Sequence, residues 1–268
     1  MSKKIKNALV TGGSSGIGME FSKLLIKDGY RVIIVAKPEE ELKKAEKWFQ
    51  KHLPDADIIY HQQDLAIPGA AQELYNFTSE NGYTIDILIN NAGFATFGQY
   101  SDIPIERELS MINLNVITIY HLTRLYLKEM VARNSGKILI TSSTAALVPS
   151  PKMAAYAATK AFSFNYGMAV NDELKDLNSN VSITVLCPPS TRTGFQHTAG
   201  MDDLKLFDNK RLSKDPDFVA KKAYEALLKG KEMVIPGTFA RILLQAFNKM
   251  ARRKVVLRLM KLGKWGLK

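Results

Sequence analysis

Short apolar runs rich in β-branched residues alternate along most of the chain with longer stretches in which apolar residues recur at helical spacing. A short apolar run with polar flanks is typical of a buried strand, and the longer amphipathic pattern is typical of a helix. The pattern predicts strands at residues 5–10, 31–36, 57–61, 85–90, 137–141, 181–186 and 233–235. It predicts helices at residues 16–27, 39–52, 69–80, 105–133, 153–176 and 217–229.

This alternation is typical of repeated βαβ units, because each crossover helix returns the chain to the same end of the sheet. We therefore expect an α/β protein with a single Rossmann-type, doubly wound parallel sheet of about seven strands and helices on both faces. No internal repeat, low-complexity segment or linker interrupts the pattern, so residues 1–237 are expected to form one domain. Residues 238–268 form a basic, apolar tail that either belongs to the same unit or contacts a membrane surface.

The composition is that of an ordinary globular chain, with 46% apolar and 24% charged residues among 268. Cys187 is the single cysteine, which excludes an intramolecular disulfide and a multi-cysteine metal site and favours a reducing compartment. We find no secretion signal and no uninterrupted run of about 18 apolar residues that could span a membrane. These features predict a cytoplasmic protein without a metal site.

The formal net charge of +11 is concentrated at the end of the chain. Residues 238–268 carry nine basic side chains and no acidic one, which leaves 28 basic against 26 acidic residues elsewhere. The charge therefore does not indicate a nucleic-acid-binding domain. Because apolar residues at helical spacing lie between the cations, the tail has the pattern of a helix that lies on a membrane surface. The alternative is that this apolar stripe packs over a pocket or a partner subunit.

The first predicted strand leads through the sequence TGGSSGIG, residues 11–18, directly into the first predicted helix. Glycines at such a junction let the backbone approach a pyrophosphate, and the helix N-terminus supplies free N–H groups and a partial positive charge. The alternative is a tight strand-to-helix turn without a ligand. The dinucleotide interpretation assigns to cofactor binding the residues Gly12, Ser14, Ser15, Gly16, Ile17 and Gly18.

Tyr156 and Lys160 are four positions apart in the helix predicted at 153–176, so they share one face of it. The pKa of a free tyrosine is near 10, and a neighbouring cation lowers it by favouring the phenolate. The pair is therefore a candidate general acid/base. The alternative is a solvated helix surface, on which the same spacing is common.

Two motifs together resemble the short-chain dehydrogenase/reductase family, over residues 4 to about 237. The first is the TGxxxGxG spacing of residues 11–18, and the second is Asn90-Asn91-Ala92-Gly93 after the fourth predicted strand. The resemblance implies a dinucleotide-binding α/β fold and an activity that depends on NAD(H) or NADP(H). It also implies that Asn91, Ala92 and Gly93 contact the cofactor.

Ser143 follows the fifth predicted strand directly and precedes Tyr156 by thirteen residues, which is the catalytic spacing of the family. By this resemblance, Ser143 hydrogen-bonds the substrate oxygen and Tyr156 transfers its proton. Lys160 lowers the pKa of the tyrosine and holds the nicotinamide ribose. Ser142 is the competing serine, one position out of register.

The resemblance also implies a catalytic asparagine in the helix predicted at 105–133, which holds a water that connects Lys160 to solvent. Asn115 fits the family motif better than the alternative, Asn113, which is expected to be structural.

The end of the second predicted strand is where such folds distinguish the two dinucleotides. An acidic residue there binds the ribose 2′-hydroxyl, and a basic one accommodates a 2′-phosphate. This chain has no acid at that point and carries Lys37, which favours NADP(H) over NAD(H). The resemblance adds that Asp64 and Leu65, after the third predicted strand, contact the adenine.

The family usually carries Pro-Gly after the sixth strand, but this chain reads Cys187-Pro188-Pro189. Pro189 has a fixed φ and no N–H, so we expect an altered contact with the nicotinamide. Cofactor contacts are still implied for Pro188, Thr191 and Thr193. Cys187 is expected to be a small buried residue rather than a nucleophile.

These inferences predict an NADP(H)-dependent oxidoreductase that transfers a hydride between nicotinamide and the carbonyl or alcohol of a small molecule. We expect a homodimer or homotetramer with no nucleic-acid partner, and a lid at residues 188–215. The alternatives are a catalytically silent dinucleotide-binding sensor and a membrane-surface protein in which the tail is the main functional element. An apolar substrate is indicated by the loop residues Phe94, Phe97, Leu147, Val148, Phe195 and Met201.

Overall fold

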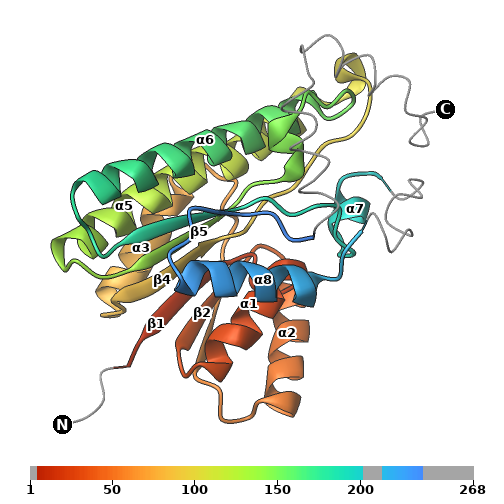
Figure 1. Ribbon diagram of the computed structural model, residues 1–268. Helices are drawn as coiled ribbons and strands as arrows, with labels where there is room; N and C mark the ends of the chain where they lie inside the picture. The colour runs from red at the N-terminus through yellow and green to blue at the C-terminus, as the bar shows by residue number, and fades with distance from the viewer. Residues whose placement is uncertain (1–4, 202–212, 238–268) are drawn as a thin grey trace.

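The computed structural model describes residues 5–201 and 213–237. Its strands are β1 (Asn7–Thr11), β2 (Arg31–Ala36), β3 (Ile58–Gln62), β4 (Ile85–Asn90), β5 (Lys137–Thr141), β6 (Ser182–Leu186) and β7 (Met233–Val234). They pair in parallel in one sheet of seven strands, in the order β3-β2-β1-β4-β5-β6-β7 (Figure 1). The predicted fold class is thereby confirmed. The strand order changes direction between β1 and β4, so the crevice for a ligand is expected at their carboxyl ends.

Helices cover both faces of this sheet. The structure has α1 (Gly16–Lys27), α2 (Glu39–His52), α3 (Ala70–Glu80), α4 (Ile105–Ile112), α5 (Ile119–Ala132), α6 (Ala154–Asp176), α7 (Phe195–Thr198) and α8 (Pro216–Leu228). One face is covered by α1, α2 and α8, and the opposite face by α3, α5 and α6 (Figure 1).

The strands divide the core into two layers. In β1, Ala8 and Val10 pack with the α1, α2 and α8 face, whereas Leu9 between them packs with the α3, α5 and α6 face. All three are fully buried. Because successive side chains of a strand point to opposite faces, a continuous apolar run is what a strand covered on both sides requires.

The helix predicted at 105–133 is present but is not regular throughout. A π-helical segment, η2 (Asn113–Thr118), joins α4 to α5 without a loop. A π-helical turn is wider than an α-helical one, and it occurs often at functional sites. The other predicted elements either coincide with those of the structure or differ from them by one or two residues at an end. Two 3₁₀ helices, η1 (Tyr100–Asp102) and η3 (Thr144–Leu147), and also α7, lie where no element is predicted.

The connection after β6 carries α7, and its beginning pairs with the segment before α8 through a bridge between Thr191 and Lys214. Residues 202–212 of the predicted lid lie outside the described residues, as does the whole tail at 238–268. Among the helices of the described ranges, none is both long and apolar enough to cross a membrane.

Candidate active site

The turn between β1 and α1 depends on its glycines. Gly12 and Gly16 have φ angles of +64° and +52°, in the left-handed region that favours glycine. A Cβ on Gly18 would lie 2.0 Å from the carbonyl oxygen of Gly12, so only glycine lets α1 start this close to the turn. Ser15 precedes α1 without a side-chain cap, which leaves helix N–H groups available to an anion.

Polar contacts join the end of β1 to the end of β4. The Thr11 hydroxyl accepts hydrogen bonds from the backbone N–H groups of Asn91 and Ala92, each at 3.0 Å. The Asn91 amide donates to the backbone oxygens of Thr11 at 3.2 Å and Gly12 at 3.3 Å. These contacts hold the two sequence motifs side by side at one edge of the sheet.

A cavity of about 770 Å³ runs along this edge. Two of the predicted site residues do not line it: Gly18 packs behind the turn, and Asn115 is fully buried behind Gly93. The predicted residues that do line it are Gly12, Ser14, Ser15, Gly16, Ile17, Lys37, Asp64, Leu65, Asn91, Ala92, Gly93, Ser143, Tyr156, Lys160, Pro188, Thr191 and Thr193.

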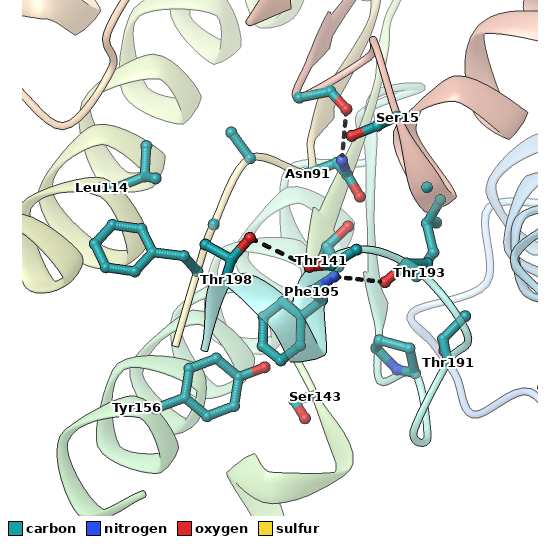
Figure 2. A pocket seen from close by; sticks show the side chains of 18 of the residues that line it. Ser15, Asn91, Leu114, Thr141, Ser143, Tyr156, Thr191, Thr193, Phe195 and Thr198 are labelled. Atoms are coloured by element: carbon teal, nitrogen blue, oxygen red, sulfur yellow. Dashed lines mark hydrogen bonds between the residues drawn. The ribbon is translucent and has the colours of Figure 1, made fainter. Parts of the chain in front are cut away.

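Ser143, Tyr156 and Lys160 lie together at what we call the buried end of the cavity, where each is at most 9% exposed. The Tyr156 hydroxyl points toward Ser143 (Figure 2). The Ser143 hydroxyl accepts the Ala145 N–H at 3.1 Å, so the start of η3 fixes its position. Lys160 Nζ lies 5.7 Å from the centre of the Tyr156 ring and donates to the Thr141 carbonyl at 2.9 Å.

Burial decides the protonation of these groups. Burial raises the pKa of Tyr156 to about 12, and hydrogen bonding with Ser143 opposes this rise. Burial also lowers the pKa of Lys160 to about 8. The expectation that the Tyr156 pKa is lowered is therefore wrong, because burial raises it. At neutral pH Tyr156 is a phenol that can donate a proton, and Lys160 is a cation that loses its own proton readily.

Asn115 lies in the π-helical segment η2. Its amide nitrogen donates to the Phe94 carbonyl at 3.0 Å and to the Thr159 hydroxyl at 3.1 Å. Its Oδ1 is buried without a partner among the described residues. A Cβ on Gly93 would lie 2.8 Å from that oxygen and 3.2 Å from Lys160 Nζ, so the glycine leaves both polar groups near the cavity. An unpaired buried oxygen is a suitable partner for an ordered water.

Ser142 and Asn113, the alternatives to Ser143 and Asn115 in the sequence, both make hydrogen bonds within the fold. The Ser142 hydroxyl donates to the backbone oxygen of Lys160 at 2.8 Å. The Asn113 amide donates to the backbone oxygen of Ala66 at 2.6 Å. Both contacts tie a helix to a neighbouring strand end or loop, so these side chains are already engaged.

Charged side chains face the opposite end, which we call the exposed end of the cavity. Lys37 Nζ pairs with Asp64 at 2.8 Å, and the lysine side chain is 69% exposed. Glu41, which sequence reasoning missed, accepts hydrogen bonds from the hydroxyls of Ser14 and Ser15 at 3.2 Å each. All five residues line the cavity, so a carboxylate lies beside the glycine-rich turn.

Comparison with known proteins identifies the family. The model for short chain dehydrogenases matches residues 6–203. The chain belongs to the short-chain dehydrogenase/reductase family. It is 32% identical over 190 residues to the uncharacterized oxidoreductase YvaG of Bacillus subtilis (strain 168), covering 70% of this chain and 69% of that protein. It is 30% identical over 204 residues to the acetoacetyl-CoA reductase of Acinetobacter sp. (strain RA3849), covering 76% and 81%.

A solved structure is also similar, the closed form of serine dehydrogenase complexed with NADP+. It has 27% sequence identity and a TM-score of 0.71, covering 82% of this chain and 88% of that one. The short-chain dehydrogenase described here is therefore an oxidoreductase that acts on CH–OH or C=O groups with a nicotinamide dinucleotide.

The residues present in this dehydrogenase fit such a cofactor. The glycine-rich turn places backbone along the cavity where a side chain would block it. At the buried end, Thr141 Oγ1 and Asn115 Oδ1 are buried polar atoms without partners in the described part of the chain. Buried polar atoms are normally paired, so these two are suited to a bound group or an ordered water.

The loop after β6 reaches the glycine-rich turn. A Cβ on Gly16 would lie 3.1 Å from Thr193 Cγ2. The Pro188 carbonyl accepts the Thr144 N–H at 3.1 Å, and the Pro189 carbonyl accepts the Thr191 hydroxyl at 2.8 Å. The Pro189 carbonyl is therefore hydrogen-bonded within the loop, and Thr191 and Thr193 still line the cavity.

Only some of the loop residues that indicated an apolar substrate line the cavity. Phe94, Phe195 and Met201 line the cavity, and the Phe195 ring lies 5.7 Å from that of Tyr156. Leu147 and Val148 do not line it, because they pack toward Val185, Cys187 and Ile235 near the end of β6. Phe97 packs in the cluster around Tyr156 without reaching the cavity. Cys187 is fully buried, as expected.

Sequence reasoning also missed Arg107, Ser110, Leu114 and Met153 among the lining residues. Arg107 and Ser110 lie on α4, and Leu114 lies on η2. A polar residue at an outward position of an amphipathic helix is normally solvated, so the sequence pattern does not place Arg107 or Ser110 at a cavity. No motif marks them, so only the folded chain reveals their position.

Proposed function

We propose that this chain is an NADP(H)-dependent carbonyl reductase of apolar substrates, with Tyr156 as the group that exchanges a proton with the substrate oxygen. The observation that carries the proposal is the continuity of one cavity, from the glycine-rich turn to Ser143, Tyr156 and Lys160. Bound NADPH supplies the hydride for the carbonyl carbon. The protein positions that carbon and stabilises the charge that develops on its oxygen.

Ser143 and Tyr156 act on the substrate oxygen from one side of the cavity. Ser143 donates a hydrogen bond to it, and Tyr156 donates a proton as negative charge develops there. The raised pKa of Tyr156, about 12, keeps the phenol protonated at neutral pH, as reduction requires. In the reverse direction the tyrosinate must form, and Lys160, 5.7 Å from the ring centre, stabilises it.

Lys160 and Asn115 resupply the proton. Lys160 carries an ammonium whose pKa is lowered to about 8, so the proton is released readily toward Tyr156. Asn115 Oδ1 holds a water that reprotonates the lysine, which accounts for its buried, unpaired oxygen. Lys160 also binds the nicotinamide ribose hydroxyls.

The preference for NADP(H) rests on Lys37 at the exposed end. Its ion pair with Asp64 is solvated, and such pairs contribute only about 0–1 kcal/mol, so the ammonium is free to turn toward a 2′-phosphate. The similar serine dehydrogenase structure contains NADP+. Glu41 opposes this preference, because its carboxylate lies on the hydroxyls of Ser14 and Ser15.

We also propose that the enzyme is a homodimer or homotetramer. The segments η2, α5 and α6 carry outward apolar side chains, among which Ile117, Tyr120 and Phe162 are 51%, 42% and 38% exposed. Phe162 stacks on Tyr166 and Tyr166 contacts Tyr120, so the rings form one continuous patch. A patch of this kind is suited to a second subunit.

The experiment that tests the proposed function is a screen of ketones and aldehydes with NADPH, followed by the loss of NADPH absorbance. Turnover of any carbonyl compound above the Tyr156→Phe control supports the proposal. NADPH binding without turnover of any compound would instead favour the silent dinucleotide sensor. The role of the tail at 238–268 is tested by binding of the full chain and of a chain ending at Gly237 to anionic liposomes.

A further inference from the structure

Arg107 is a further cation at the cavity, apart from Lys37 and Lys160. It lies on α4 with an exposed side chain and lines the cavity. Its guanidinium donates to the backbone oxygen of Thr198 on α7 and lies 5.9 Å from the centre of the Phe94 ring. Arginine carries five N–H donors in a planar fork, so one contact with a carbonyl leaves the others available.

A chain of contacts places this guanidinium close to the reacting groups. Phe94 and Phe195 belong to the same apolar cluster as Tyr156, and the Phe195 and Tyr156 rings are 5.7 Å apart. Thr198 lies one helical turn after Phe195 in α7 (Figure 2). Arg107 therefore contacts Phe94 and α7, both of which belong to the apolar surroundings of Tyr156.

Lys37 and Arg107 both line the cavity but differ in the charges around them. At the exposed end, Lys37 is paired with Asp64, and Glu41 lies on the neighbouring serines. Among the described residues that line the cavity, no other carboxylate is present, and Arg107 makes no ion pair with any described side chain. A guanidinium that lines a cavity and has no carboxylate partner among the described residues favours an anion there.

We propose that Arg107 binds an anionic group of the substrate, and that the preferred substrates are ketones in which a chain of several atoms joins the anion to the carbonyl. This inference rests on the proposed function, because it assumes that the carbonyl lies at Tyr156. The chain lies against Phe94, Phe195 and Met201, and the anion reaches the cation at the edge of the cavity. The anion is either a carboxylate or the phosphate part of an acyl thioester.

The test compares matched substrates in the full chain. Oxo acids of increasing chain length are compared with their methyl esters, and acetoacetyl-CoA is compared with the uncharged acetoacetyl-N-acetylcysteamine. We expect kcat/KM to be roughly tenfold or more higher for the anionic member of one pair, through a lower KM. The pair that shows the difference identifies the source of the anion as a carboxylate or a phosphate.

Arg107→Gln is the decisive variant, because glutamine can still donate to the Thr198 carbonyl. It should remove the advantage of the anionic substrate, so that kcat/KM falls far more for the anionic member of the pair than for its uncharged partner. Lys152→Gln is the matched control, since Lys152 Nζ lies 5.8 Å from the Phe97 ring without lining the cavity. This control should keep the preference of the wild type.

Calorimetric binding of the oxo acids to the protein separates this inference from the proposed function. Binding that depends on Arg107 but leads to no turnover would support anion recognition and contradict the reductase proposal. Turnover without a preference for either anion, or an equal loss for charged and uncharged substrates in Arg107→Gln, would overturn the inference. Arg107 would then have only a structural role, in which its hydrogen bond to Thr198 holds α7 against α4. Absence of oxo-acid and thioester binding in the wild type would overturn it as well.

Discussion

The two ends of the cavity hold ionisable side chains in opposite surroundings. At the buried end Lys160 is 3% exposed, and burial lowers its pKa to about 8. At the exposed end the side chain of Lys37 is 69% exposed and pairs with Asp64 in water. Desolvation determines the pKa of a buried charged group, whereas a solvated ion pair contributes only about 0–1 kcal/mol to stability. In the proposed function, the buried end therefore carries the chemistry and the exposed end adjusts the choice of cofactor.

The largest expected effect comes from removing the ammonium at the buried end. Lys160→Met should lower kcat by roughly a hundredfold or more, because proton supply to Tyr156 and stabilisation of the tyrosinate are both lost. It should also weaken NADPH binding, since the lysine is proposed to hold the ribose. Steady-state kinetics and fluorescence titration of NADPH measure the two effects. Unchanged NADPH affinity would contradict the proposed contact between Lys160 and the ribose.

The same variant has a pH-dependent effect on stability. The folded pKa of Lys160 lies below its unfolded value, so the folded protein binds fewer protons between about pH 8 and 10.5, and stability rises with pH there. Below pH 8 the buried charge costs the fold about 3 kcal/mol, at about 1.4 kcal/mol per pH unit. Relative to the wild type, Lys160→Met should therefore gain most in Tm below pH 8 and lose this gain progressively as the pH rises to about 10.5 and above. A Tm difference that does not vary with pH would contradict the buried ammonium.

The sequence predicts the elements of this fold well, because strands buried on both faces must be continuously apolar and helices covering them must be amphipathic. It does not predict the π-helical turn at Asn115, since one wider turn barely changes the apolar pattern. Nor does it show that Leu147 and Val148 turn away from the cavity, because η3 redirects the chain after Ser143.

Charge pairing is equally hidden in the sequence. Lys37 and Asp64 meet because parallel strands β2 and β3 end beside each other, and Glu41 meets the serines because α2 starts near the glycine-rich turn. The motifs mark the glycines, Tyr156 and Lys160, whereas Glu41 and Arg107 occupy ordinary polar positions on helices.

A charge reversal at the exposed end should change selectivity without abolishing turnover. Lys37→Asp replaces an attraction to the 2′-phosphate with a repulsion, so the ratio of NADPH to NADH affinity should fall roughly ten- to hundredfold. Dissociation constants of both cofactors give this ratio. Lys44→Asp, an exposed lysine of α2 away from the cavity, is the matched control and should leave it unchanged. An equal ratio in Lys37→Asp and the wild type would place the selectivity elsewhere.

The smallest expected effect concerns Glu41. Glu41→Gln removes a negative charge beside Ser14 and Ser15, so NADPH affinity should rise roughly two- to fivefold, and NADH affinity should rise less. Glu40→Gln removes the same charge from the same turn of α2 without touching the cavity. A similar gain in both variants would show a general charge effect rather than a local one.

The central claim is that Tyr156 acts on the substrate oxygen and not on the cofactor. Its most direct test is the Tyr156→Phe variant, with turnover and NADPH affinity measured on the same preparation. The ring, which packs against Phe195, is retained and only the hydroxyl is lost. The account predicts that turnover falls by roughly a hundredfold or more while NADPH affinity stays nearly unchanged. Turnover within about tenfold of the wild type would contradict the assignment of Tyr156 as the proton donor.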